Sequence, residues 1–157
     1  MMNICMIRID ERLIHGQILL KWVRHLNCVR ILVIDNETAN DPVMSSLLRL
    51  SLPVGVELEV CSLNQGISAI LNCNESGGVM VLVKELRTIK ELWSAGVPLE
   101  HVNLARIPFC PGSRKLAAGI YVSPEDEGIL FGLLEAGVNI VVQIVPESEP
   151  VNAETLL

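Results

Sequence analysis

Short apolar runs alternate with amphipathic stretches along the whole chain. Seven of these runs, rich in β-branched and other apolar residues, predict strands. They cover Asn3 to Ile9, Arg30 to Asp35, Glu57 to Cys61, Val79 to Lys84, Val102 to Arg106, Gly119 to Val122 and Val138 to Val145. Because helix-length segments separate most of them, the pattern is typical of an α/β fold with a largely parallel sheet. We expect one wide sheet in a single domain that spans residues 1–157.

Amphipathic segments predict helices between the strands. From about Gly16 to Leu26 the apolar side chains share one stripe and the polar ones lie opposite, which predicts a helix with an outward polar face. Capping signals mark four further helices. These signals are Asp41-Pro42, Ser62 with Gln65, Thr88 with Glu91, and Ser123-Pro124 with Gly137 at the far end. Trp22 and Trp93 fall on apolar stripes, so we expect both in the core.

Composition excludes several classes of protein. Half of the residues are hydrophobic and the mean hydropathy is +0.46, yet each apolar run is interrupted before the ~18 residues that a membrane-spanning helix needs. We see no secretory signal and expect a cytoplasmic protein. A net charge of -6 and an aromatic content of 3% argue against nucleic-acid binding. So apolar a chain has either a thick core or a dimer interface, and a homodimer is left open.

Metal and disulfide chemistry find no support in the spacing of ligand residues. The five cysteines form no C-x-x-C pair and are read as core thiols. His25 and His101 lie too far from His15 for a zinc site. We therefore expect no metal and no other cofactor.

Candidate chemistry lies just after the first predicted strand, because ligands of parallel sheets gather at the carboxyl ends of the strands. A neutral imidazole such as that of His15 is a nucleophile that can carry a phosphoryl group. Arg12 offers a fork of donors for phosphate oxygens, and the amides of Gly16 and Gln17 add the partial positive charge of a helix start. Asp10 either fixes the tautomer of the imidazole or pairs with Arg12. A helix cap or a polar surface side chain is the alternative reading of this histidine.

The segment Arg8-Ile9-Asp10-Glu11-Arg12-Leu13-Ile14-His15-Gly16-Gln17 resembles the active-site signature of the EIIB component of the mannose, fructose and sorbose family of bacterial sugar phosphotransferase systems (PTS). Weaker matches follow in order along nearly the whole chain. They are Ile31-Leu32-Val33-Ile34 with Asn36-Glu37, Pro53-Val54-Gly55-Val56, Ala95-Gly96-Val97, Asn103 at the start of a loop, Phe109 with Gly112, and Val122-Ser123.

The resemblance implies an open, mostly parallel sheet with helices on both faces and His15 on the loop after the first strand. It implies that Nδ1 of His15 accepts a phosphoryl group from a phosphorylated EIIA protein. The phosphohistidine then donates the group to a sugar held by the membrane components EIIC and EIID, so the chain acts as a phosphohistidine–sugar phosphotransferase at the inner face of the membrane. Arg12 matches the arginine that contacts the phosphoryl group, and Asp10, Gly16 and Gln17 match the rest of the loop.

Further residues complete the predicted site. Where the family commonly has two glycines this chain has Ala105-Arg106, and Arg106 either adds a phosphate contact or obstructs the partner. Asn36 stands at a position that is usually acidic in the family. The predicted partner surface consists of Arg8, Lys84, Phe109, Arg114 and Lys115.

Two other functions are compatible with parts of the sequence. A regulator of the same fold that reports its phosphorylation state without transporting sugar fits the same residues. A phosphoaspartyl receiver is suggested by Asp10-Glu11 and Lys84, but the third predicted strand ends in Val60-Cys61-Ser62, without an aspartate to phosphorylate.

Overall fold

A seven-stranded sheet with the order β3-β2-β4-β1-β5-β8-β9 forms the centre of the computed structural model, which describes residues 1–157. Its strands are β1 (Asn3–Asp10), β2 (Cys28–Ile34), β3 (Glu57–Cys61), β4 (Gly78–Val83), β5 (His101–Arg106), β8 (Asn139–Val142) and β9 (Val151–Asn152). Six strands pair in parallel, and only β9 runs antiparallel to its neighbour. The predicted α/β class and mostly parallel sheet are therefore confirmed.

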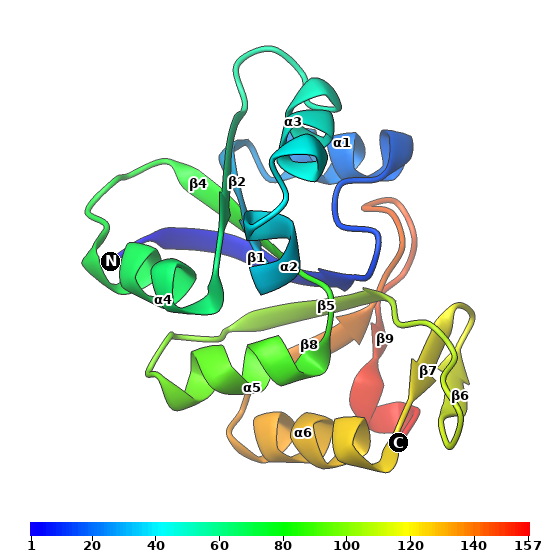
Figure 1. Ribbon diagram of the computed structural model, residues 1–157. Coiled ribbons are helices and arrows are strands. Elements are labelled where there is room, and N and C mark those ends of the chain that lie inside the picture. The colour runs from blue at the N-terminus through cyan, green and yellow to red at the C-terminus, as the bar shows by residue number, and fades with distance from the viewer.

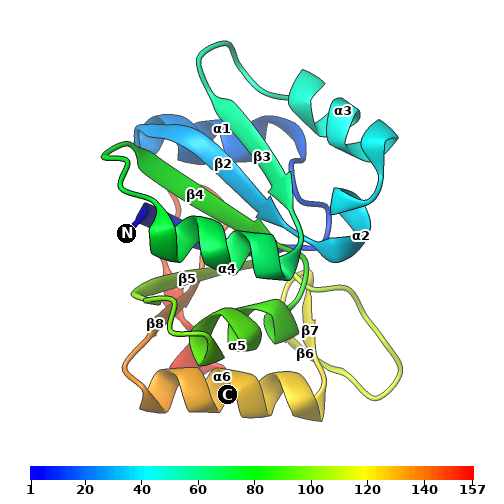
Figure 2. The same ribbon diagram turned by 60° about the vertical axis from the view of Figure 1, so that its left-hand side comes forward.

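Helices cover both faces of the sheet (Figure 2). One face carries α1 (Gly16–His25) and α3 (Pro42–Leu50), and the other carries α4 (Leu63–Asn72), α5 (Leu86–Ser94) and α6 (Pro124–Glu135). A short α2 (Asn36–Ala39) follows β2, and a single 3-10 turn (Ala153–Thr155) follows β9. None of these helices has the length and apolar character that crossing a membrane requires.

The strands are apolar throughout because both faces of the sheet are buried. Ile7 and Ile9 of β1 contribute to a cluster of 26 buried residues beneath α4, α5 and α6. Met6, on the opposite face, joins a cluster of 13 that includes Trp22 of α1. Much of the apolar excess of the sequence is thus core. Trp22 is buried as predicted, whereas Trp93 is 42% exposed, because Leu92 takes the core-facing position of α5 and the next residue points about 100° away.

Most of the predicted helix starts are confirmed. Asp41 caps α3, and capping boxes at Ser62 and Ser123 open α4 and α6. The box predicted at Thr88 with Glu91 is wrong, since α5 already begins at Leu86. The buried stripe of Leu86, Ile89 and Leu92 extends the helix one turn beyond the polar signal.

The run from Gly119 to Val122 was predicted as a strand of the main sheet, and this is wrong. It forms β7 (Ile120–Val122), which pairs antiparallel with β6 (Arg114–Ala117) in a separate hairpin. Gly119 has φ +74° in the turn that joins them, a conformation that favours glycine. A bridge between Ile107 and Ile120 ties this hairpin to the end of β5. The seventh strand of the main sheet is β9.

The last long apolar run also ends earlier than predicted. β8 stops at Val142 instead of Val145 because Gln143 turns the chain, donating hydrogen bonds from Nε2 to the carbonyls of Pro146 and Ser148. The segment that follows packs against α1, where Trp22 Nε1 donates to the carbonyl of Ile144 at 2.8 Å. This contact brings the β8–β9 loop beside α1 (Figure 1).

All five cysteines are free thiols. Burial raises the pKa of Cys28 and that of Cys61 to about 12, so both stay protonated at neutral pH. Thiols in that state are poor nucleophiles. Their role is packing, as the sequence indicated for these two residues.

Candidate functional site

A backbone hydrogen bond and two buried side chains hold the loop between β1 and α1 in place. The backbone carbonyl of Asp10 accepts a hydrogen bond from the N–H of Leu13 at 2.9 Å. Leu13 has φ +59°, a conformation that is uncommon for residues other than glycine. Its side chain and that of Ile14 are buried in the cluster beneath α1, which compensates for the strain. The chain therefore leaves the sheet by one defined path.

His15 comes next and its ring is exposed. It occupies the N-cap position of α1 with extended backbone (φ −143°, ψ 118°), and its side chain caps no amide. Gly16 then adopts φ +62°, which lets the chain bend from the extended histidine into the helix. The first amide groups of α1 consequently have no side-chain acceptor, and the positive end of the helix dipole faces the same side of the molecule. His15 is therefore the N-cap residue by position, but its side chain makes no capping hydrogen bond.

Arg12 is held by the carboxylate of Asp10. Nε lies 3.0 Å from Oδ1 and Nη2 lies 3.1 Å from Oδ2, and Oδ1 also accepts the backbone N–H of Arg12. This hydrogen bonding raises the pKa of Arg12 above its usual value. Of the two roles weighed for Asp10, the structure shows the pairing with Arg12. The Asp10 side chain is 5% exposed and that of Arg12 is 31% exposed. A buried carboxylate therefore anchors a partly exposed guanidinium, whose Nη1 has no hydrogen-bond partner in the protein.

The loops after β4 and β5 flank this site, because β1 lies between those strands in the sheet. After β5, Arg106 Nε donates to Glu11 Oε1 at 2.8 Å, and the backbone carbonyl of Arg106 accepts from the N–H of Glu11 at 3.3 Å. The guanidinium predicted to contact phosphate is thus paired with a carboxylate of the His15 loop. Sequence reasoning missed Glu11, since the pairing depends on the register that puts Asp10 beside Arg106.

After β4, the ammonium of Lys84 lies 2.9 Å from Asp35 Oδ2. Lys84 therefore faces the end of β2 rather than open solvent, although its side chain is 31% exposed. Asn36 follows Asp35 in the chain. Its side-chain Oδ1 accepts a hydrogen bond from the N–H of Leu63 and so connects α2 to the first turn of α4. Its amide serves the fold of this corner of the molecule.

The ion pair of Asp35 makes stability depend on pH. Burial alone raises the pKa of Asp35, but hydrogen bonds from Thr38 and Lys84 outweigh it and leave the pKa below its ordinary value. The stabilisation is thus complete above the ordinary aspartate pKa and disappears as the pH falls through the folded-state pKa. We expect Asp35→Asn to cost about 1 kcal/mol at neutral pH and nothing in strong acid. Urea unfolding at both pH values checks this, and equal losses at both would contradict it.

The hairpin beyond β5 carries most of the predicted partner surface. Phe109 is 65% exposed and packs edge to face on Tyr121, with ring centroids 5.7 Å apart. Lys115 is exposed and lies opposite Tyr121 in the hairpin register. Arg114 is paired with Glu127 of α6. In Figure 1 the hairpin projects from the same end of the sheet as the β1–α1 loop. An aromatic pair and one unpaired cation are therefore displayed at the same end of the sheet as the site.

Arg8 was also predicted on the partner surface, and this is wrong because it is 3% exposed. Its guanidinium donates to Asn103 Oδ1 at 2.6 Å. Asn103, expected at the start of a loop, is itself buried within β5. A charged residue inside an otherwise apolar strand of a parallel sheet was the signal that pointed to burial.

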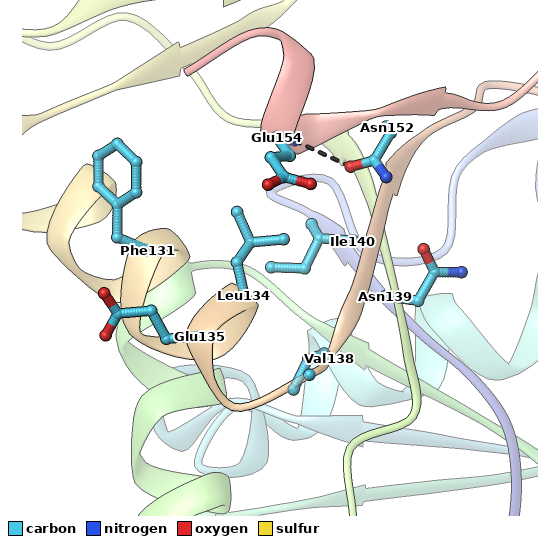
Figure 3. Close-up of a pocket in the computed structure, with 9 residues that line it drawn as sticks. Phe131, Leu134, Glu135, Val138, Asn139, Ile140, Asn152 and Glu154 are labelled. Atoms are coloured by element: carbon cyan, nitrogen blue, oxygen red, sulfur yellow. Dashed lines mark hydrogen bonds between the residues drawn. The ribbon is translucent and has the colours of Figure 1, made fainter.

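The larger cavities of the molecule are not lined by Arg12 or His15. One of about 440 Å³ lies between the end of α6, the start of β8 and the segment after β9, with Phe131 and Leu134 on one side and Glu154 on the other (Figure 3). Residues at the amino end of β8 line this cavity. His15 instead follows the carboxyl end of β1. The candidate site is an exposed loop and not a pocket.

Residues 4–157 match the model of the family described as the PTS system sorbose subfamily IIB component. The chain belongs to this family. It is 31% identical to the N-acetylgalactosamine-specific phosphotransferase enzyme IIB component 2 of Escherichia coli K12, over 100% of both chains. The IIBSor domain of the sorbose permease from Klebsiella pneumoniae superposes with a TM-score of 0.92 at 28% identity, covering 99% of this chain and 96% of that one. The chain is also 31% identical to the mannose-specific EIIAB component of Escherichia coli K12, covering 92% of itself and 45% of that protein.

This membership confirms the resemblance drawn from the sequence. Components of this kind act as phosphotransferases in sugar uptake. The family of the chain and its fold, a sheet with helices on both faces, are thereby established.

Proposed function

We propose that His15 of this IIB component carries a phosphoryl group from a phosphorylated EIIA partner to a sugar. The observation that carries the proposal is that one loop presents an exposed imidazole, a guanidinium anchored three residues earlier, and the uncapped start of α1. Arg12 and the first amides of α1 supply the positive charge that a transferring phosphoryl group needs. Family membership gives the reaction class.

Two displacements make up the transfer. Nδ1 of His15 attacks the phosphorus of the donor phosphohistidine, and the donor nitrogen leaves with the electron pair of the broken P–N bond. A sugar hydroxyl then attacks the same phosphorus and loses its proton, and His15 recovers its lone pair. Arg12 stabilises the equatorial oxygens in both steps, while Gly16 and Gln17 contribute their backbone N–H groups. Neither step requires a nucleotide or a metal ion.

The names of the relatives support the proposed partners. The mannose-specific EIIAB relative combines an A and a B component in one polypeptide, which supports an EIIA protein as the phosphoryl donor. The acceptor sugar is held by EIIC and EIID at the inner face of the membrane. The relatives are named for N-acetylgalactosamine, sorbose, fructose and mannose, so we assign only the class of these sugars. A homodimer stays a prediction.

The partner-facing surface includes the residues that border the His15 loop. Arg106 flanks it, Lys84 lies farther toward β2 in its ion pair with Asp35, and Lys115, Arg114 and Phe109, which packs on Tyr121, belong to the region of the hairpin. In this arrangement Arg106 reaches the phosphoryl group only by leaving Glu11. We assign Arg106 to the rim of the phosphate site on that basis.

Labelling with the upstream phosphotransferase proteins tests the proposal. Incubation with phosphoenolpyruvate, the general phosphotransferase proteins and EIIA should place one phosphoryl group on the chain, stable in base and labile in acid, and mass spectrometry should locate it on His15. A base-labile acyl phosphate would contradict the proposal and favour a receiver-like protein. Uptake of labelled sugars by cells with and without the protein then separates a transporter from a regulator, since only the transporter changes uptake.

A further inference from the structure

Arg8 is a buried cation that the transfer steps described above do not use. It lies on β1 two residues before Asp10 and is 3% exposed. Nη1 donates to Asn103 Oδ1 at 2.6 Å and lies 3.4 Å from the carbonyl oxygen of Gln143. The guanidinium carbon also lies 5.9 Å from the centre of the Trp22 ring. Each of these partners is neutral.

A charge this deeply buried is normally paired with an opposite charge. The carboxylate that acts on Arg8 is that of Asp10, but both of its oxygens already bind Arg12. Burial lowers the pKa of Arg8 to about 10, so the group is still protonated at neutral pH. Arg8, Asp10 and Arg12 together thus hold one positive charge in excess beneath the loop.

The excess charge lies below His15 and not beside it. Alternate residues of a strand share a face about 6.6 Å apart, which puts Arg8 one step beneath Asp10. Trp22 follows His15 by about two turns of α1, a rise of about 10 Å. The guanidinium therefore does not touch a phosphoryl group on His15. A charge buried as deeply as that of Arg8 is screened less by water and salt than a surface charge, so part of its field reaches the loop.

We propose that Arg8 is a positioning residue that holds a fixed positive charge beneath the β1–α1 loop and thereby favours the phosphorylated state of His15. The inference deepens the proposed function and rests on it. A phosphoryl group brings close to two negative charges at neutral pH, and the excess charge of Arg8 offsets part of them. Arginine suits the place because its planar head can lie over Trp22 while it donates to Asn103.

The test is the equilibrium of phosphoryl exchange between phosphorylated EIIA and the IIB component. Intact-mass measurement gives the fraction of folded, monodisperse protein that carries the group. We expect Arg8→Met to lower the equilibrium ratio about fivefold, and Arg8→Lys, which keeps the charge, to stay within about twofold of the unmodified protein. Arg8→Gln repeats the neutral substitution while keeping a donor for Asn103, should the methionine variant fold poorly.

Arg24→Met is the control, because it removes an exposed positive charge from α1, the helix that follows His15, and should leave the ratio unchanged. An unchanged ratio in folded Arg8→Gln would overturn the role of Arg8 while the labelling of His15 stands. A purely structural role would lower the melting temperature of Arg8→Lys and Arg8→Gln alike without separating their ratios. Failure of the unmodified protein to accept any phosphoryl group would instead count against the proposed function itself.

Discussion

Replacing His15 by alanine should abolish phosphorylation of the chain by EIIA, with a residual rate at least a thousandfold below that of the unmodified protein. The ring is exposed and makes no hydrogen bond in the fold, so its removal takes away the nucleophile and little else. Surface substitutions of this kind change the free energy of unfolding by about 0.5 kcal/mol or less. Transfer from labelled phospho-EIIA, followed on gels over time, measures the rate.

The other two histidines provide the controls. His25 is the last residue of α1, at the opposite end from His15. His101 is the first residue of β5, at the amino end of the strands. Both are exposed, but neither belongs to the loop that carries Arg12 and the start of α1. His25→Ala and His101→Ala should accept phosphate at the normal rate. Normal labelling of His15→Ala, with loss in either control, would move the phosphoacceptor to another residue.

Sequence patterns predicted the sheet well because its strands are buried on both faces. Such strands read as continuous apolar runs, and six of the seven predicted runs belong to the main sheet. The seventh, around Ile120, has the same composition but pairs with a neighbour only a few residues away. Composition does not distinguish a short hairpin from a sheet strand. The true seventh strand, Val151–Asn152, has two residues, too few for any periodic signal.

The contacts of the site were also predictable only where the two residues are close in sequence. Asp10 and Arg12 are two residues apart, so their pairing was one of two arrangements open from the sequence. The pair of Glu11 with Arg106 joins residues 95 positions apart, and the contact of Arg8 with Asn103 spans the same separation. Both depend on the register of β1 against β5. A single sequence carries no signal of that register, so the partners of Arg8 and Arg106 could not be predicted.

Substitution of Arg12 by alanine should slow phosphoryl transfer to His15 by roughly tenfold to a hundredfold, the worth of one charge-assisted hydrogen bond made in the transition state. Asp10 orients the guanidinium through two hydrogen bonds, so little entropy is lost when the phosphoryl group arrives. Because Arg12 is partly exposed, the fold should tolerate its loss. Single-turnover transfer from phospho-EIIA at saturating donor isolates this step from binding.

Arg12→Lys and Asp10→Asn separate charge from orientation. The lysine variant keeps the charge but loses the planar fork that matches the carboxylate of Asp10, so we expect it to recover only part of the rate. Asp10→Asn leaves Arg12 in place without its anchor and should slow transfer about tenfold. The asparagine should also lower the free energy of unfolding by about 1 to 3 kcal/mol, because position 10 is buried. If Arg12→Ala transferred at the normal rate, the amides at the start of α1 would be the group that binds the phosphoryl oxygens, and Arg12 would have no part in the chemistry.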